Sequence, residues 1–254
     1  MKFLILYIAV VLLVVSDMQV LFGRDPKPKI KVLIVTGGHD YFPEPFYAAF
    51  DAIPTISYDT VVHPEANKLI ASPRINEYDV LVFYDMGEAI SAEQKVAYLN
   101  LLQKGKSFIY LHHALVSYQD WPEFVKIVGG HYHTGPVVVN GDTLRANYRD
   151  NVLVPVKIED KKHPVTRGLA NFETRDEIYM NAEILPTVKP LLSTTHPESM
   201  KYLAWINNYG NSEVLYIQLG HGDSGLSNTN FRKLLRQAIE WSAERHSKKL
   251  NGTR

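Results

Sequence analysis

Histidine is the residue type with the greatest capacity for chemistry in this chain of 254 residues, which contains ten histidines. Four of them form two pairs within one stretch: His112 with His113, and His131 with His133. The unperturbed pKa of an imidazole lies near ~6.5, so a histidine can both accept and release a proton near neutral pH. The stretch Ser107–Gly135 therefore predicts a catalytic or ligand-binding site.

The sequence around each histidine pair indicates where the pair lies relative to an expected strand. His112 follows an apolar run, Phe108–Leu111, typical of a buried strand, and ligands of parallel sheets bind just beyond such strand ends. His131 and His133 flank Tyr132 and project to one face if Tyr132 lies in a strand, because side chains alternate along a strand. We expect His112 to be catalytic, and His131, Tyr132 and His133 to contact substrate.

Three further candidates lie far from this stretch in the sequence. His39 follows the first strand-like run of the chain, and His221 follows the last one. Glu177 has the chemistry of a general base, or of a carboxylate that holds an imidazole in one tautomer. We expect His221 and Glu177 to be catalytic together with His112, and His39 to contact substrate.

The same residues allow two other interpretations. A zinc or similar divalent ion could be held by histidines among His39, His112, His133 and His221, with Glu177 activating water. No short zinc motif is present, so these ligands would have to converge in three dimensions. The sequence therefore leaves open whether a divalent metal ion is the cofactor. A third interpretation is a carbohydrate-binding protein without catalytic activity.

The first half of the chain predicts alternating strands and helices. The apolar runs and their flanking turn residues indicate a doubly wound, mostly parallel sheet. Ser91 and Gln94 have the spacing of a capping box at the start of one helix. The expected strands are residues 30–36, 57–62, 79–84 and 107–111, and the expected helices are residues 43–52 and 92–104.

The second half predicts an antiparallel extension of this sheet. Short extended runs at residues 136–139, 143–148 and 152–158 surround the turn signal Asn140 and Gly141. Two more runs, at 202–206 and 214–219, indicate a hairpin with a loop over residues 207–213. An amphipathic helix then follows, and residues 247–254 are expected to be a frayed tail. Residues 30–246 form one domain in this interpretation.

The amino terminus and the composition bear on location and partners. Lys2 precedes an unbroken apolar run at residues 3–15, which is shorter than the ~20 residues of a membrane span and is typical of a secretory signal. We expect residues 1–23 to be a signal peptide and 24–29 a linker, leaving a periplasmic or secreted protein outside the membrane. The formal charge is zero and no basic stripe is present, so nucleic acid is not an expected partner.

Several short segments, taken in order, resemble one protein family. They read VTGGHD near the start, LHHA after the fourth expected strand, then GGHYH, HPVTRGL, DEIY and finally VLYIQLGH. In this order they are similar to the ThuA-like family, which is named for a trehalose-utilisation protein. The resemblance covers roughly residues 30–245.

The resemblance implies both a fold and a field of function. ThuA-like proteins resemble class I glutamine amidotransferases, whose fold is a flavodoxin-like three-layer α/β sandwich. Those enzymes place a cysteine at the turn that here contains His112 and His113, but this chain has no cysteine, so it is not expected to hydrolyse glutamine. The family implies carbohydrate utilisation. We expect a small carbohydrate as the partner. The activity stays open between simple binding and that of a hydrolase or lyase acting on sugar derivatives.

Overall fold

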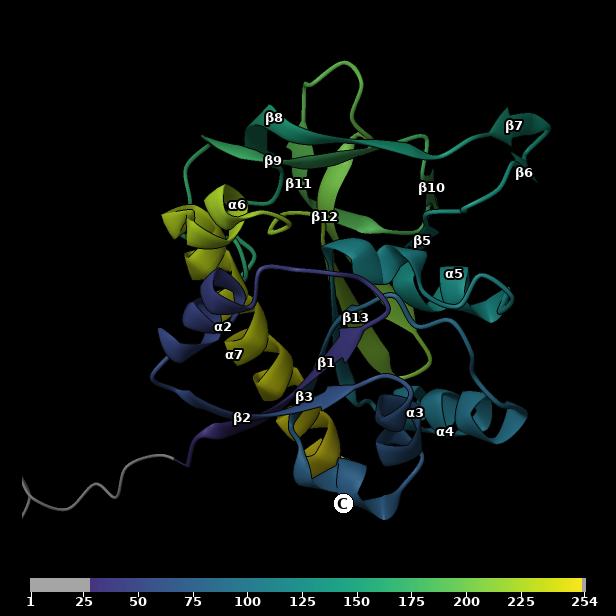
Figure 1. The fold of residues 1–254 in the computed structure, drawn as a ribbon. Coiled ribbons are helices and arrows are strands. Elements are labelled where there is room, and N and C mark those ends of the chain that lie inside the picture. Colours follow the sequence, from purple (N-terminus) through teal and green to yellow (C-terminus); the bar gives the residue numbers. More distant parts are fainter. Residues whose placement is uncertain (1–27, 253–254) are drawn as a thin grey trace, which may run out of the picture.

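A nine-stranded mixed sheet forms the centre of the computed structural model, which describes residues 28–252 (Figure 1). The strand order is β2-β1-β3-β4-β13-β12-β11-β8-β9. The strands β1 (Ile30–Gly37), β2 (Ile56–Val62), β3 (Val80–Asp85) and β4 (Ser107–Leu111) pair in parallel, and β13 (Ser212–Ile217) continues this parallel half beside β4. This pairing confirms the expected doubly wound half. Long apolar runs are stable as parallel strands that are buried on both faces.

The other half of the sheet is antiparallel, as expected. It contains β12 (Tyr202–Tyr209), β11 (Lys189–Thr194), β8 (Asn147–Ile158) and β9 (Phe172–Met180). The loop between β12 and β13 is shorter than the expected 207–213, since both strands continue to a tight turn at Gly210 and Asn211. Two small sheets lie outside the main one: β6 (Val137–Val139) with β7 (Asp142–Leu144), and β5 (Gly130–His131) with β10 (Glu183–Ile184).

Helices cover both faces of the sheet, which makes the expected three layers. One face packs against α2 (Pro43–Asp51), α6 (Asp223–Ser227) and α7 (Thr229–Gly252). The opposite face packs against α3 (Glu65–Ile70), α4 (Ala92–Gln103) and α5 (Glu123–Val128). Short 3₁₀ turns occupy η1 (Pro73–Glu77) and η2 (His112–Val116). The two cores meet at the sheet, whose central strands are fully buried.

Local signals explain where several elements begin and end. Ser91 and Gln94 form the expected capping box at the start of α4, which satisfies backbone groups that a helix end leaves open. Helix α7 runs to Gly252, so residues 247–252 are helical rather than the expected frayed tail.

The expected signal peptide and most of the linker lie outside the described residues. Within residues 28–252, no helix combines the length and the apolar character that a membrane crossing requires.

Candidate functional site

The carboxyl ends of the parallel strands gather imidazoles at one edge of the sheet. His39 follows β1, His112 and His113 follow β4, and His221 follows β13. The ring centroids of His39 and His113 are 4.7 Å apart, and those of His112 and His221 are 4.8 Å apart. Segments distant in sequence thus meet at the edge where parallel sheets bind their ligands.

An unusual backbone conformation turns both residues of the His112 and His113 pair into this cluster. His112 has a φ of 44°, in the left-handed region that non-glycine residues seldom adopt. In a continuing strand, the side chain of His113 would point to the face opposite that of His112 and would pack or cap there. The turn instead brings the two rings to a centroid distance of 5.8 Å, and His113 lines the pocket beside His39. Strain of this kind is found where function fixes the backbone.

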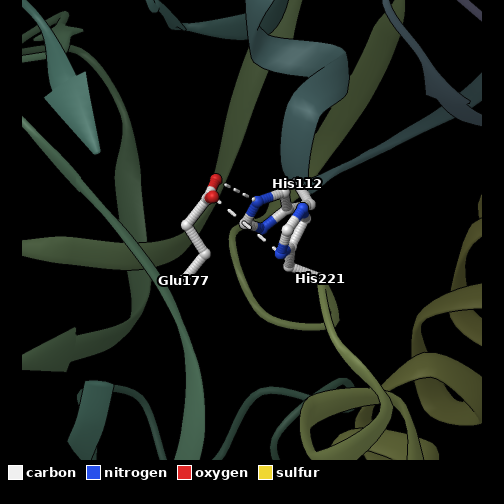
Figure 2. Close-up of side chains that lie close together, drawn as sticks. All are labelled: His112, Glu177 and His221. Carbon is white, nitrogen blue, oxygen red and sulfur yellow. Dashed lines mark hydrogen bonds and ion pairs between the residues drawn. The ribbon is translucent and has the colours of Figure 1, made fainter. Parts of the chain in front are cut away.

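Glu177 reaches the cluster from β9, the outermost strand of the antiparallel half of the sheet. The β8–β9 ribbon extends past β11, which pairs with only the last residues of β8. A register shift between Arg149 and Val152 leaves Glu177 opposite the bulge, between the paired residues Asp176 and Ile178. Bulges re-aim side chains in this way, often near active sites. Figure 2 shows the Glu177 carboxylate facing the rings of His112 and His221.

His112 and Glu177 form a buried contact. His112 Nε2 lies 3.0 Å from Glu177 Oε1, and the other ring nitrogen, Nδ1, donates to the backbone carbonyl oxygen of Gln218. Burial and the neighbouring His221 hold the pKa of His112 well below its usual value. Burial raises the pKa of the Glu177 carboxyl. Both groups therefore favour their neutral forms more strongly than they would in water.

His221 faces the same carboxylate from the other side. Its Nδ1 lies 3.9 Å from Glu177 Oε2 and 3.6 Å from Asp150 Oδ1. This nitrogen is buried and has no hydrogen-bond partner among the described residues. Such an atom loses its contact with water without compensation, so it marks a point where a ligand, ion or proton would be stabilised.

Asp176 fixes the backbone that carries His221. Its carboxylate accepts hydrogen bonds from the backbone N–H groups of Gly220 at 2.7 Å, His221 at 2.9 Å and Glu177 at 3.0 Å. Burial raises the pKa of Asp176 to about 7, although these three donors oppose the shift. Gly225 packs so closely that an added Cβ would lie 2.4 Å from Asp176 Oδ2. Asp176 is therefore a positioning residue for two members of the cluster.

A pocket of about 390 Å³ opens over this cluster. Of the expected site residues, His39, Tyr132, Glu177 and His221 line it, whereas His112 lies behind the wall and is fully buried. Apart from His113, which belongs to a histidine pair, no local pattern singles out the other members, because they come from the ribbon and from loops whose position only the fold decides. These other lining residues are Met86, His113, Val116, Thr134, Tyr148, Asp150 and Tyr179.

His131 and His133 lie beside each other and adjoin, in sequence, the pocket-lining residues Tyr132 and Thr134. Their ring centroids are 4.6 Å apart, although only His131 belongs to a strand, so strand alternation is not the reason. His131 is buried, and its Nε2 donates to the backbone carbonyl of Ser117 at 3.0 Å. His133 pairs with Glu183 at 2.7 Å. Neither lines the pocket, so the structure does not place them as the substrate contacts that we expected.

We predict that His131 makes stability depend on pH. Burial, together with the charge of His133, lowers the pKa of His131 to about 4 from 6.5 in the unfolded chain. Between these values the unfolded chain binds more protons, so the free energy of unfolding falls as the pH falls from 6.5 to 4. This group contributes a loss of about 2 kcal/mol between pH 7 and pH 5. Urea unfolding at both pH values measures the total loss in the wild type, to which other buried histidines such as His112 also contribute.

The matched variant for this prediction is His131→Gln, which keeps a side-chain donor for Ser117 and does not titrate. Its loss of stability between pH 7 and pH 5 should be smaller than that of the wild type by about the same 2 kcal/mol. Equal losses in the two proteins would show that His131 is not a buried neutral imidazole.

One group of residues has the composition and geometry to hold a metal ion. His112, Glu177 and His221 each offer one ligand atom, and these atoms all lie within 4.8 Å of one another. His39 and His133, which we also considered as ligands, are not in this group, and Glu177 is a candidate ligand rather than only a base. Two imidazoles and a carboxylate suit zinc and similar divalent ions.

Comparisons with known proteins agree with this architecture. The family model described as trehalose utilisation (ThuA) matches residues 31–242. A ThuA-like protein from Parabacteroides merdae has a similar structure, with a TM-score of 0.71 and 20% identity over 85% of this chain and 90% of that one. Another, from Bacteroides uniformis, has a TM-score of 0.66 and 21% identity, covering 87% and 94%.

A more distant likeness extends to a larger protein. A cold-adapted β-galactosidase from Rahnella sp. R3 gives a TM-score of 0.55 at 12% identity, covering 84% of this chain but only 32% of that one. At such low identities, these structures establish the shared fold alone. No curated protein matches the sequence.

Proposed function

This chain belongs to the ThuA family of trehalose-utilisation proteins, and we propose that it is an enzyme acting on a sugar or keto-sugar glycoside. The proposed chemistry is acid–base catalysis by histidine and carboxylate groups. The observation that carries this proposal is the convergence of Glu177 and His221 at one pocket, with His112 held against Glu177 from behind. Titratable groups whose surroundings shift their pKa values cluster at functional sites.

The pocket wall has the chemistry that a sugar requires. Tyr132, Tyr148 and Tyr179 offer flat apolar surfaces to the C–H faces of a sugar ring. Thr134 and Asp150 supply polar groups for its hydroxyls. A mostly apolar pocket with a few convergent polar groups is the usual form of a small-molecule site.

Glu177 and His221 are the two expected catalytic groups that border the pocket. A keto group weakens the C–H bond beside it, so a base can remove that proton while an acid protonates the departing glycosidic oxygen. His112 cannot touch a sugar because it is buried, and we assign it the role of holding Glu177. The arrangement supports a hydrolase or lyase. Glutamine hydrolysis would require a nucleophile that the cysteine-free chain lacks.

We also propose that the protein is exported and acts in the periplasm or outside the cell on a small carbohydrate. The support for export is the apolar run behind Lys2, which has the length of a signal sequence. The absence of cysteine agrees with an oxidising compartment, where free thiols would mispair.

Turnover and binding must be measured separately to test this function. We expect purified protein to release monosaccharide from trehalose or from 3-keto-glycosides, followed by chromatography, and His221→Asn to bind the same sugar in calorimetry without releasing product. Binding by both proteins with no product from either would favour the alternative, a carbohydrate-binding protein. Failure of the wild type to bind or convert any of these sugars would contradict the proposal.

A further inference from the structure

The contact between His112 and Glu177 pairs two acceptor atoms. Because His112 Nδ1 donates to the Gln218 carbonyl oxygen, the proton of the neutral ring lies on Nδ1. His112 Nε2 therefore presents a lone pair to Glu177 Oε1, which is only 3.0 Å away. A neutral imidazole and a carboxylate repel each other in this geometry. Something positively charged, either a proton or a metal ion, must lie between them.

A proton resolves only part of this arrangement. A proton on Glu177 would satisfy His112, but one proton cannot also satisfy the buried His221 Nδ1. That nitrogen has no hydrogen-bond partner among the described residues and faces the second oxygen of the same carboxylate at 3.9 Å.

We propose that His112 Nε2, His221 Nδ1 and the Glu177 carboxylate bind one divalent transition-metal ion, with zinc as the representative case. A single ion would contact all three groups, whose ligand atoms lie within 4.8 Å of one another. Figure 2 shows both rings turned toward the carboxylate. The two imidazoles follow the ends of β4 and β13, and the carboxylate belongs to β9. Two imidazoles and one carboxylate leave coordination positions open for water or substrate.

The groups behind these ligands match those of known metal sites. Ligand imidazoles usually donate their second N–H to a backbone carbonyl, as His112 does to Gln218. Asp176 holds the backbone of His221 and Glu177 by accepting their N–H groups. The open side faces the pocket, where Asp150 Oδ1 lies 3.6 Å from His221 Nδ1.

This inference rests on the proposed function and changes the roles within it. A bound ion would polarise a carbonyl or hydroxyl oxygen of the sugar. Glu177 and His221 would then serve as ligands rather than as proton-transfer groups. His39 and His113, which stack on each other in the pocket wall, would be left as the imidazoles available for proton transfer.

Metal titration of the purified protein tests the proposal. After removal of metals with a chelator, we expect the wild type to bind one equivalent of Zn²⁺ in calorimetry, and Co²⁺ to give visible absorption bands of nitrogen and oxygen coordination. Glu177→Gln and His221→Ala should weaken binding by at least about 100-fold. Circular dichroism would verify that these variants are folded.

The chain offers a matched control in its other close histidine–glutamate pair. His133 and Glu183 lie 2.7 Å apart, and no third ligand joins them among the described residues. His133→Ala and Glu183→Gln should keep wild-type affinity for Zn²⁺. Absence of one-equivalent binding in the wild type, or binding that Glu177→Gln and His221→Ala leave intact, would overturn the proposal.

Measurements of Zn²⁺ binding and of sugar turnover on the same purified protein distinguish this inference from the proposed function. Specific binding of Zn²⁺ by a protein that converts no sugar would support the metal site and contradict the enzymatic proposal. Sugar turnover at an undiminished rate by protein shown to be free of metal would overturn the metal inference and leave the enzymatic proposal standing.

Discussion

Replacing Glu177 by glutamine is expected to abolish most sugar turnover while leaving the fold intact. In the wild type, His112 Nε2 lies 3.0 Å from Glu177 Oε1. The glutamine amide has the size of the carboxyl group and can donate a hydrogen bond to this nitrogen, so the buried contact remains satisfied. It can neither transfer a proton at neutral pH nor act as an anionic ligand. Loss of a positioned acid or base typically lowers the rate by about 10²–10⁴-fold, which is the expected fall in kcat/KM.

Glu183→Gln is the control for this prediction. It makes the same chemical change in another carboxylate that pairs with a histidine, but one that does not line the pocket. Its kcat/KM on the same sugar should match that of the wild type. If the Glu177 variant kept wild-type turnover, Glu177 would have no role in the chemistry.

Asp176→Ala is expected to cost about 3–5 kcal/mol of the free energy of unfolding. The substitution removes the acceptor of three backbone N–H groups, those of Gly220, His221 and Glu177. Each buried donor that loses its partner costs about 1–3 kcal/mol, and water entering the space recovers part of that cost. Urea unfolding at pH 8, above the pKa of about 7 for Asp176, gives the measurement.

Two variants bracket this result. Asp176→Asn keeps one carbonyl oxygen as an acceptor and should lose less stability than Asp176→Ala. Asp150→Ala removes an exposed carboxylate close to the same histidine, 3.6 Å from His221 Nδ1, and should change stability by under about 0.5 kcal/mol. A loss at Asp176 no larger than at Asp150 would show that the carboxylate does not hold the loop.

The sequence predicted the parallel half of the fold because local patterns there are unambiguous. Strand β1 follows from a near-continuous run of β-branched and apolar residues, and the start of α4 follows from the capping box at Ser91 and Gln94. Since parallel strands place their carboxyl ends on one edge, the histidines after these strands were also expected to meet. His39, His112 and His221 do meet, with ring contacts linking them.

Other parts of the site depended on interactions that no local pattern encodes. His131 is buried and donates a hydrogen bond to the Ser117 carbonyl, and His133 pairs with Glu183, so neither lines the pocket. His113 enters the pocket only because His112 adopts a left-handed conformation, which tertiary packing must stabilise.

By itself, the sequence determined the layered α/β fold, the strand ends that carry His112 and His221, and the absence of any cysteine nucleophile. Only the tertiary structure decided how the β8–β9 ribbon crosses that edge. A bulge opposite Glu177 and pairing with distant strands set this path, and both depend on contacts between residues far apart in the chain. The ribbon closes the pocket and brings the carboxylate against two imidazoles, so the chemistry of the site arises from long-range packing rather than from spacing.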